Sequence, residues 1–308
     1  MALRAVFLGN DPWSVPSLEA LDRSPHEVAA VVTREPRPAG RGGALRPTSV
    51  AEASRRLDLP LREVATVKEG EGFEALRGPD PDVLVVVAYG EILPPAVLAV
   101  PRIAPINVHF SLLPALRGAD PVRRAILEGL GTTGVTIMRM DEGMDTGPIL
   151  LQAEEPIRTE DDAGSLGERL AALGGRLLVE TLDRIEAGAA EEREQNHERA
   201  TLASKIPREE EWIDWSAPAD DVVRRVRALA PDPGARTRFR GRVLKAYAAR
   251  PEEAAGEPGT VATAEGALIV AAGEGAVALE EVLPEGKRRM SAAEFIHGYR
   301  PEPGERLG

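Results

Sequence analysis

The feature that most constrains the fold is an apolar run at residues 83–88, VLVVVA, in which no side chain is polar. A short run that is apolar at every position is typical of a strand covered on both faces, as in the parallel sheets of α/β proteins. Residues 3–8 and 27–33 are predicted to form two more strands, and residues 14–21 a helix between them with Ser14 as its N-cap. This alternation of strand and helix predicts a doubly wound, mostly parallel sheet.

The chain has 308 residues, too many for one simple core, so we expect two domains. A predicted amphipathic helix at 162–186 closes the first domain, residues 1–188. The polar stretch 189–205 has no clear period and is interpreted as a linker. Residues 206–308 contain several short predicted strands with glycine turns, including a hairpin through 240–241, and this pattern favours a small barrel.

The composition excludes several classes of protein. The absence of cysteine excludes disulfides, thiol catalysis and cysteine-ligated metal sites. No apolar run approaches the roughly 20 residues that a membrane-spanning helix needs. The first residues, MALRAVFLGNDP, lack the apolar segment of a signal peptide and are predicted as a strand. We therefore expect a cytoplasmic protein that does not bind membranes.

Charge is distributed unevenly along the second predicted domain. The formal net charge of −12 argues by itself against nucleic-acid binding. Residues 222–250, however, contain eight Arg, one Lys and one Asp, whereas residues 251–286 contain eight Glu and no basic residue. Two interpretations remain open: two differently solvated faces of one domain, or a basic surface for an anionic ligand with an acidic flank turned away from it.

Glycines in the first domain do not indicate a nucleotide site. Gly9 follows the first predicted strand alone, without the glycine pattern of a dinucleotide-binding loop, which disfavours a nicotinamide dehydrogenase. Residues 34–47, REPRPAGRGGALRP, imitate a phosphate-binding loop but do not join a strand directly to a helix. Composition alone is also compatible with a solvated loop at this position.

The segment 103–121 carries the most specific chemistry. Residues 103–108 are predicted as a strand that stops at His109, and side chains alternate along a strand, so Asn107 and His109 project on the same side. An amide and an imidazole that emerge together can both donate hydrogen bonds to one oxygen, which is what a site that stabilises an oxyanion requires. Ser111 has no base nearby in the sequence and is not interpreted as a nucleophile.

A second polar position lies downstream, in the loop 141–147 between two predicted strands. Asp145 in this loop can accept a hydrogen bond from His109 and favour its protonated form. It can also receive a proton, directly or through water, from an attacking amine. In open α/β sheets, ligands bind beyond the carboxyl ends of the strands, where residues 89–94 and 107–114 both fall.

Asn107, His109 and Asp145, with SLLP at 111–114 between them, resemble the folate-dependent formyltransferases. The resemblance extends from the first residues to the last, and it is fullest to the members that formylate methionyl-tRNA. The further matching stretches are VPSLEAL at 15–21, RPAGRG at 37–42, AYGEILP at 88–94, MDTG at 144–147, KI at 205–206, IDWS at 213–216 and EGKRRMSAAEF at 285–295. SLLP alone is a weak signal, whereas the ordered set is specific.

The resemblance implies a formyltransferase Rossmann-like domain followed by a small OB-like β-barrel domain that binds tRNA. It implies an enzyme of translation initiation and one-carbon metabolism. Such an enzyme transfers a formyl group from its cosubstrate, 10-formyltetrahydrofolate, to the amino group of initiator methionyl-tRNA, by direct attack of the amine and without a metal. In this reaction Asn107 and His109 stabilise the oxyanion, while Asp145 orients His109 and handles protons. We expect a monomer.

The resemblance also indicates binding residues. The folate is expected to contact the segment Ser111, Leu112, Leu113 and Pro114, and the backbone near Ile92 and Leu93. The tRNA is expected to contact Arg41 and Lys205, together with the basic face of a predicted helix that carries Arg224, Arg225 and Arg227. The family's usual lysine pair after RG is absent, and Gly43 and Ala44 stand in its place.

Two other functions remain open at this level. The same chemistry could serve a different acceptor, namely glycinamide ribonucleotide, an amino sugar nucleotide or water, although enzymes for the first usually lack such a second domain. Alternatively, the chain is an RNA-binding module without catalytic activity. The presence of Asn107, His109 and Asp145 argues against this alternative.

Overall fold

The computed structural model describes residues 2–39, 44–263 and 266–308. The chain divides into two compact units. Unit 1 comprises Met1–Pro121, Thr132–Pro156 and Gly167–Ala203, and unit 2 comprises Val122–Gly131, Ile157–Leu166 and Ser204–Gly308. Most of the stretch predicted as a linker, residues 189–205, therefore lies within unit 1. None of the helices in the described ranges combines the length and the apolar character that a membrane span requires.

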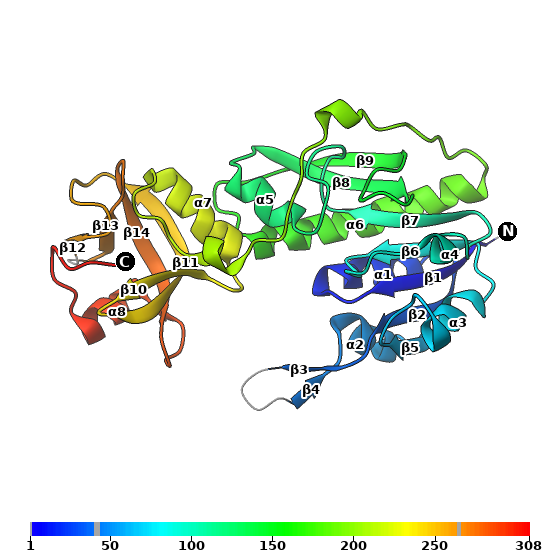
Figure 1. The fold of residues 1–308 in the computed structure, drawn as a ribbon, viewed down its shortest axis with the longest axis horizontal. Coiled ribbons are helices and arrows are strands. Elements are labelled where there is room, and N and C mark those ends of the chain that lie inside the picture. Colours follow the sequence, from blue (N-terminus) through cyan, green and yellow to red (C-terminus); the bar gives the residue numbers. More distant parts are fainter. Residues whose placement is uncertain (1, 40–43, 264–265) are drawn as a thin grey trace. The chain divides into compact units, whose positions relative to one another are not determined.

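Unit 1 is built on a seven-stranded sheet in the order β5-β2-β1-β6-β7-β8-β9 (Figure 1). Its strands are β1 (Arg4–Gly9), β2 (Glu27–Arg34), β5 (Leu61–Val64), β6 (Val83–Val87), β7 (Ala104–His109), β8 (Thr132–Arg139) and β9 (Ile149–Pro156). The pairs among the first five of these are parallel, whereas β8 and β9 are antiparallel to their neighbours. The predicted mostly parallel sheet is confirmed, and β6, buried at every position, lies at its centre.

The helices of unit 1 are α1 (Val15–Asp22), α2 (Ser49–Arg56), α3 (Gly70–Arg77), α4 (Pro95–Leu98) and most of α6 (Ala163–Glu186), with 3-10 helices η1 (Pro12–Ser14) and η2 (His197–Arg199). A two-stranded ribbon, β3 (Arg37–Ala39) and β4 (Ala44–Arg46), projects from the sheet (Figure 1). Glycine weakens a helix, but Gly174 lets α6 approach β7 closely, because a Cβ there would lie 2.9 Å from Cγ1 of Val108. The predicted helix at 162–186 thus packs against the strand that carries Asn107 and His109.

Side-chain hydrogen bonds at the beginnings of two of these helices have different roles. Thr48 caps α2 by accepting a hydrogen bond from the backbone N–H of Ala51 at 3.0 Å. Ser14 occupies the predicted N-cap position of α1, but its hydroxyl makes no capping bond. It donates instead to the carbonyl of Val87 at 2.7 Å, and this bond ties the beginning of α1 to the end of β6.

Asp82 connects the beginning of β6 to its surroundings. Its carboxylate accepts a hydrogen bond from the backbone N–H of Arg4 at 2.8 Å, and bonds from Nε and Nη2 of Arg102 at 3.1 and 2.8 Å. Burial raises the pKa of Asp82, but the hydrogen bonds from Arg4 and Arg102 outweigh burial and leave this pKa below its ordinary value.

Unit 2 contains a six-stranded antiparallel sheet in the order β10-β11-β14-β13-β12, with β15 paired to β14. Its strands are β10 (Ala235–Phe239), β11 (Arg242–Glu252), β12 (Val261–Thr263), β13 (Leu268–Ala271), β14 (Ala276–Pro284) and β15 (Met290–Ser291). Its helices are α5 (Pro121–Leu127), whose first residue belongs to unit 1, α7 (Ala219–Leu229), α8 (Ala292–Tyr299) and the 3-10 helix η3 (Arg208–Glu211). Bulges in β11 near residues 246–249 bend the sheet into a half-barrel. This architecture agrees with the predicted small OB-like barrel.

Local sequence signals of unit 2 are also confirmed. Arg240 and Gly241, between β10 and β11, have φ angles of 48° and 74°, as the tight hairpin turn predicted there requires. Ser291 and Glu294 form a reciprocal capping box at the start of α8. The core between the sheet and this helix includes Phe239, whose ring is 5.3 Å from a second buried ring, that of Phe295 in α8.

Candidate active site

Three polar side chains converge at the end of β7. Asn107 and His109 project on the same side of the strand, as predicted, and both face the carboxylate of Asp145. Asn107 Nδ2 donates to Asp145 Oδ1 at 3.3 Å, and His109 Nδ1 lies 3.7 Å from Asp145 Oδ2. Asn107 is opposite Val86 of the neighbouring parallel strand. The group therefore lies at the carboxyl edge of the parallel strands, where α/β folds bind their ligands.

The neighbours of His109 determine which ring nitrogen is available. Nε2 lies 2.9 Å from the carbonyl oxygen of Leu116, and a carbonyl can only accept, so Nε2 holds a hydrogen and donates it. The ring is buried, with 6% of its side chain exposed. Nδ1 is therefore the nitrogen that can act on a ligand. Its 3.7 Å separation from Asp145 is longer than a hydrogen bond, so Nδ1 is not committed to the carboxylate.

Asp145 is held in an unusual backbone conformation. Its φ of 55° is in the left-handed region, where a non-glycine residue is strained unless its surroundings impose the conformation. The loop connects β8 to β9 and leaves the sheet beside the beginning of β7, since Met140 N donates to Pro105 O at 2.8 Å. It must fold back along the sheet to bring Asp145 to Asn107. There Gly118 N donates to Asp145 Oδ2 at 2.8 Å.

Two residues that the sequence analysis did not single out support this site. Gln195, from the stretch predicted as a linker, donates through Nε2 to the carbonyls of Asp145 and Gly147 at 2.9 and 2.7 Å. Asn10, directly after β1, accepts hydrogen bonds from the end of β2 and donates one to the carbonyl of Tyr89 after β6. The amide in the sequence GND after the first strand is a signal that could have indicated Asn10. Gln195 carries no such signal.

The predicted folate segment 111–114 contains two kinds of residue. Ser111 and Leu113 are buried, and their polar groups bond to other residues of unit 1. The Ser111 hydroxyl, for example, donates to a carbonyl within the same turn at 2.6 Å. Leu112 and Pro114 are half-buried. If this segment contacts a ligand, the contact is therefore made by Leu112 and Pro114.

The loop after β6, where the pterin contact is predicted, presents unpaired backbone. Ile92 exposes 82% of its surface, whereas Leu93 exposes 6%. Within residues 2–39, 44–263 and 266–308, no group makes a hydrogen bond to the backbone of Ile92 or Leu93. Tyr89, at the start of the loop, is buried, and burial raises the pKa of its hydroxyl to about 12. No described residue thus occupies the hydrogen-bonding groups of this backbone.

The residues predicted to contact tRNA have different surroundings. Arg41 lies outside the described residues, and Lys205 is exposed. Arg224, Arg225 and Arg227 are half-buried on α7, and each donates a hydrogen bond within unit 2, to a neighbouring carboxylate or to backbone carbonyls. Burial lowers the pKa of Arg227. These three arginines therefore have structural partners of their own.

Ion pairs neutralise part of the positive charge of the basic stretch. Glutamates from other segments lie beside arginines of the basic stretch, in the pairs Arg236–Glu211 at 2.8 Å, Arg240–Glu305 at 2.8 Å and Arg250–Glu280 at 3.2 Å. Exposed positive charge remains at Lys205, Arg242 and Lys287. The charged groups of these three side chains make no hydrogen bond or ion pair with any residue that the structure describes.

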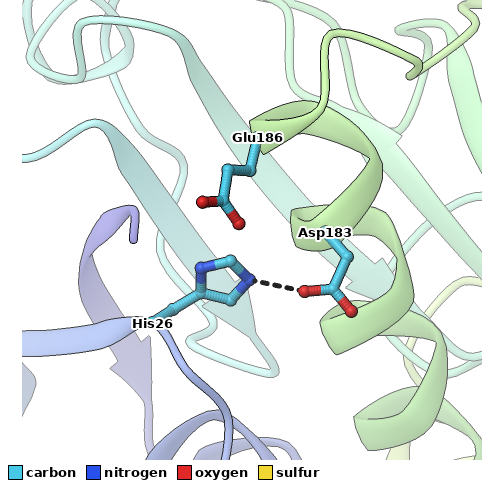
Figure 2. A group of neighbouring side chains, drawn as sticks. All are labelled: His26, Asp183 and Glu186. Atoms are coloured by element: carbon cyan, nitrogen blue, oxygen red, sulfur yellow. Dashed lines mark ion pairs between the residues drawn. The ribbon is translucent and has the colours of Figure 1, made fainter. Parts of the chain in front are cut away.

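One cluster of side chains of the kind that bind metals occurs among the described residues. The ligand atoms of His26, Asp183 and Glu186 lie within 4.8 Å of one another, and Figure 2 shows both acids on the last turns of α6. His26 Nδ1 accepts a hydrogen bond from Leu3 N at 3.3 Å, so the hydrogen of the neutral ring is on Nε2, which faces Asp183 Oδ1 at 3.2 Å. A nitrogen that holds a hydrogen cannot ligate a metal. The pair instead attaches the residue before β2 to α6.

Comparisons with known proteins agree along the whole chain. The family profile described as formyl transferase matches residues 3–182, and that described as formyl transferase, C-terminal domain, matches residues 205–300. The methionyl-tRNA formyltransferases of Methylobacterium nodulans and Koribacter versatilis are each 45% identical to this chain, over 100% and 98% of both sequences respectively. A solved structure of an N-formyltransferase from Helicobacter canadensis, in complex with folinic acid and dTDP-3-aminofucose, has a TM-score of 0.66 at 17% identity, covering 91% of this chain and 99% of its own. This last similarity shows a shared fold.

Proposed function

Because the chain belongs to the formyl transferase family, we propose that it transfers the formyl group of 10-formyltetrahydrofolate to the amino group of methionyl-tRNA. The full-length relatives that bear this activity in their names support the proposal. The observation that carries it is the convergence of Asn107, His109 and Asp145 at the carboxyl edge of the sheet. Since an amine is itself a nucleophile, the reaction needs no covalent enzyme intermediate.

In the proposed reaction the neutral amine attacks the formyl carbon, and the formyl oxygen becomes an oxyanion. Asn107 Nδ2 has two hydrogens, and only one of them is directed at Asp145, so the other can be donated to the oxyanion. His109 donates from Nδ1, because Nε2 is engaged by the carbonyl of Leu116. Two fixed donors aimed at the charge that develops in the transition state are the main source of electrostatic stabilisation.

Asp145 is assigned the movement of protons. The attacking nitrogen becomes positively charged as the new C–N bond forms, and Asp145 accepts its proton directly or through water. The bond between the formyl carbon and the folate nitrogen then breaks, the carbonyl re-forms, and the proton passes to the departing nitrogen. The carboxylate also attracts the positive charge that the His109 ring carries when both of its nitrogens hold hydrogens.

The folate is proposed to bind along the same edge of the sheet. The unpaired backbone groups of Ile92 and Leu93 suit the pterin ring, which carries donors and acceptors side by side along one edge. Leu112 and Pro114 offer apolar surface nearby in sequence to the catalytic residues. Much of the acceleration is expected to come from holding two large substrates in a reactive orientation.

The tRNA is proposed to contact exposed cations of unit 2. Lys205, Arg242 and Lys287 are free for phosphates, because no described residue engages their charged groups. The contacts assigned from the sequence to Arg41 and to the three arginines of α7 remain predictions. A preference for the initiator tRNA, a monomeric state and action in the cytoplasm also remain predictions.

Formylation of defined acceptors tests the proposed function. The full chain is given 10-formyltetrahydrofolate and methionyl-tRNA, and formylmethionine is measured over time with initiator and elongator tRNA in parallel. We expect formylation, and faster formylation of the initiator. Turnover confined to glycinamide ribonucleotide, an amino sugar nucleotide or water would contradict the proposed acceptor. Tight RNA binding without formyl transfer to any acceptor would indicate a non-enzymatic module.

Salt dependence of binding tests the proposed tRNA contacts. Replacing Lys205, Arg242 and Lys287 by alanine should weaken tRNA binding and reduce the slope of log affinity against log salt by about 0.7 to 0.9 for each phosphate that is no longer neutralised. Arg306→Ala is the matched control, because this exposed arginine of unit 2 is already paired with Glu257 at 2.7 Å. An unchanged slope in the triple variant would place the tRNA elsewhere on the protein.

A further inference from the structure

We propose that Gln195, held by Arg117, is a positioning residue that sets the Asp145 loop for formyl transfer. The inference rests on the proposed function of this site. Gln195 lies in the stretch 189–205 that was predicted as a linker, yet only 4% of its surface is exposed. Its side chain touches the backbone of the loop rather than the carboxylate, so it acts on the reaction through Asp145.

The orientation of the Gln195 amide is fixed by its partners. Oε1 accepts hydrogen bonds from Nε and Nη2 of Arg117 at 3.1 and 2.6 Å, and an arginine can only donate. Nε2 donates to the carbonyls of Asp145 and Gly147 at 2.9 and 2.7 Å, and a carbonyl can only accept. A flipped amide would set donor against donor and acceptor against acceptor. Only one orientation therefore satisfies all four bonds.

The hydrogen bonds from Gln195 are made to the part of the loop that has the strained backbone conformation. The loop folds back along the sheet, and Asp145 within it has the left-handed φ of 55°. A strained backbone conformation persists only where the surrounding structure imposes it. By binding the carbonyls on both sides of residue 146, Gln195 holds the loop in this form. Without its two hydrogens the loop can relax, and the carboxylate would leave its place opposite His109.

Arg117 connects this restraint to the rest of the site. The Arg117 guanidinium is buried, with 6% of the residue exposed, and it also bonds to the ring of His197 at 3.0 Å. Three consecutive residues each hold one part of the site: the Leu116 carbonyl holds His109, the Arg117 side chain holds Gln195, and the Gly118 N–H holds the Asp145 carboxylate. The imidazole, the loop backbone and the carboxylate are thus fixed relative to one short segment.

The substitution Gln195→Glu tests the proposal, because it keeps the size of the side chain and the one oxygen that accepts from Arg117 but replaces Nε2 and its hydrogens by a second oxygen. A carboxylate opposite a buried guanidinium forms a charge-assisted pair, which offsets part of the cost of setting the second carboxylate oxygen against the two loop carbonyls, so the variant is expected to fold. We expect kcat to fall by about ten- to a hundredfold, with the KM for 10-formyltetrahydrofolate unchanged. Gln195→Met, similar in length and without hydrogen-bonding groups for the loop, is a second variant with the same expected fall in kcat.

A double-variant cycle separates positioning from a general structural role. In an Asp145→Asn background, Gln195→Glu is expected to cost no further kcat, because its effect passes through Asp145. Thr181→Val is the control: it removes another buried hydrogen bond to a carbonyl, that of Leu177 at 2.7 Å, and should lower Tm without changing kcat.

The outcomes are distinct. Parental kcat in both Gln195 variants, or a further loss of the same size in the Asp145→Asn background, would overturn the positioning role. A parent chain that formylates no methionyl-tRNA would overturn the proposed function, and the positioning role with it.

Discussion

The substitution Asp145→Asn addresses the centre of the proposed mechanism. Asparagine has the size of aspartate, but one of its two oxygens is replaced by an amide nitrogen that cannot accept a hydrogen bond. In the parent both oxygens accept, one from Asn107 at 3.3 Å and the other from Gly118 N at 2.8 Å. If the new NH2 group faces the Gly118 N–H, two donors oppose each other. If it faces Asn107 instead, the Asn107 amide must flip so that its oxygen accepts from the new NH2 group. The second arrangement redirects the proposed oxyanion donor.

The expected magnitude follows from the 3.7 Å between His109 Nδ1 and Asp145 Oδ2. Two opposite unit charges at this distance attract each other by about 4 kcal/mol at an effective dielectric constant of about 20. The Asp145 side chain exposes 17% of its surface, so solvent screens part of this attraction. A loss of about 3 to 4 kcal/mol from the transition state corresponds to a fall in kcat of about a hundredfold to a thousandfold.

The assay is single-turnover formyl transfer to methionyl-tRNA at saturating concentrations of both substrates, with Tm measured in parallel. Glu142→Gln is the matched control, because it removes a carboxylate from an exposed position of the same loop. It is expected to leave kcat unchanged. If Asp145→Asn keeps the parental Tm and its rate stays within about tenfold of the parent, the electrostatic role of Asp145 is refuted.

Three further substitutions probe other parts of the fold. Thr48→Ala removes the cap of α2 and should lower the free energy of unfolding, measured by urea titration, by about 1 kcal/mol. The folded-state pKa of Asp82 is lowered, so its carboxylate stabilises the fold above the unfolded pKa of about 3.9, and this stabilisation is lost as pH falls through the folded value. When the pH is lowered through this range, the free energy of unfolding of Asp82→Asn, measured by urea titration, should therefore fall less than that of the parent. Gly134→Ala would place a Cβ 2.1 Å from a backbone oxygen and 2.5 Å from Leu112 Cδ2, and should lower Tm and raise the KM for 10-formyltetrahydrofolate. Gly131→Ala, whose Cβ meets nothing within 4 Å, should change neither.

The parts of the molecule that could be predicted from the sequence depend on neighbours in the chain. The apolar run at 83–88 indicated the buried central strand because burial on both faces leaves no place for a polar side chain. The alternation of side chains placed Asn107 and His109 on one side of β7 for a similarly local reason. The loop 141–147 offered Asp145 as a candidate partner of His109, but nothing in this loop specifies that it folds back to β7.

The parts that could not be predicted depend on contacts between distant segments. Gln195 binds carbonyls 48 and 50 positions earlier in the chain, and a side-chain hydrogen bond of this kind leaves no periodic pattern in the sequence. The ion pairs of unit 2 are a second example, because the pairing of strands determines which charged side chains lie next to each other. Arg250 of the basic stretch faces the acidic stretch in the pairing of β11 with β14, where Glu280 lies 3.2 Å away. A count of charges along the chain therefore does not show which of them pair with one another.

The bonds made by Gln195 have a consequence for synthesis of the protein on the ribosome, where N-terminal parts of a chain fold first. The last strand of the unit 1 sheet ends at Pro156, and α6 ends at Glu186. Gln195 and Ala203, which bonds to the backbone of Arg117, emerge only afterwards. A nascent chain that has released α6 thus has all seven strands of the unit 1 sheet but still lacks the residue proposed to position Asp145. The restraint on the loop is added by a segment of irregular structure rather than by another strand or helix.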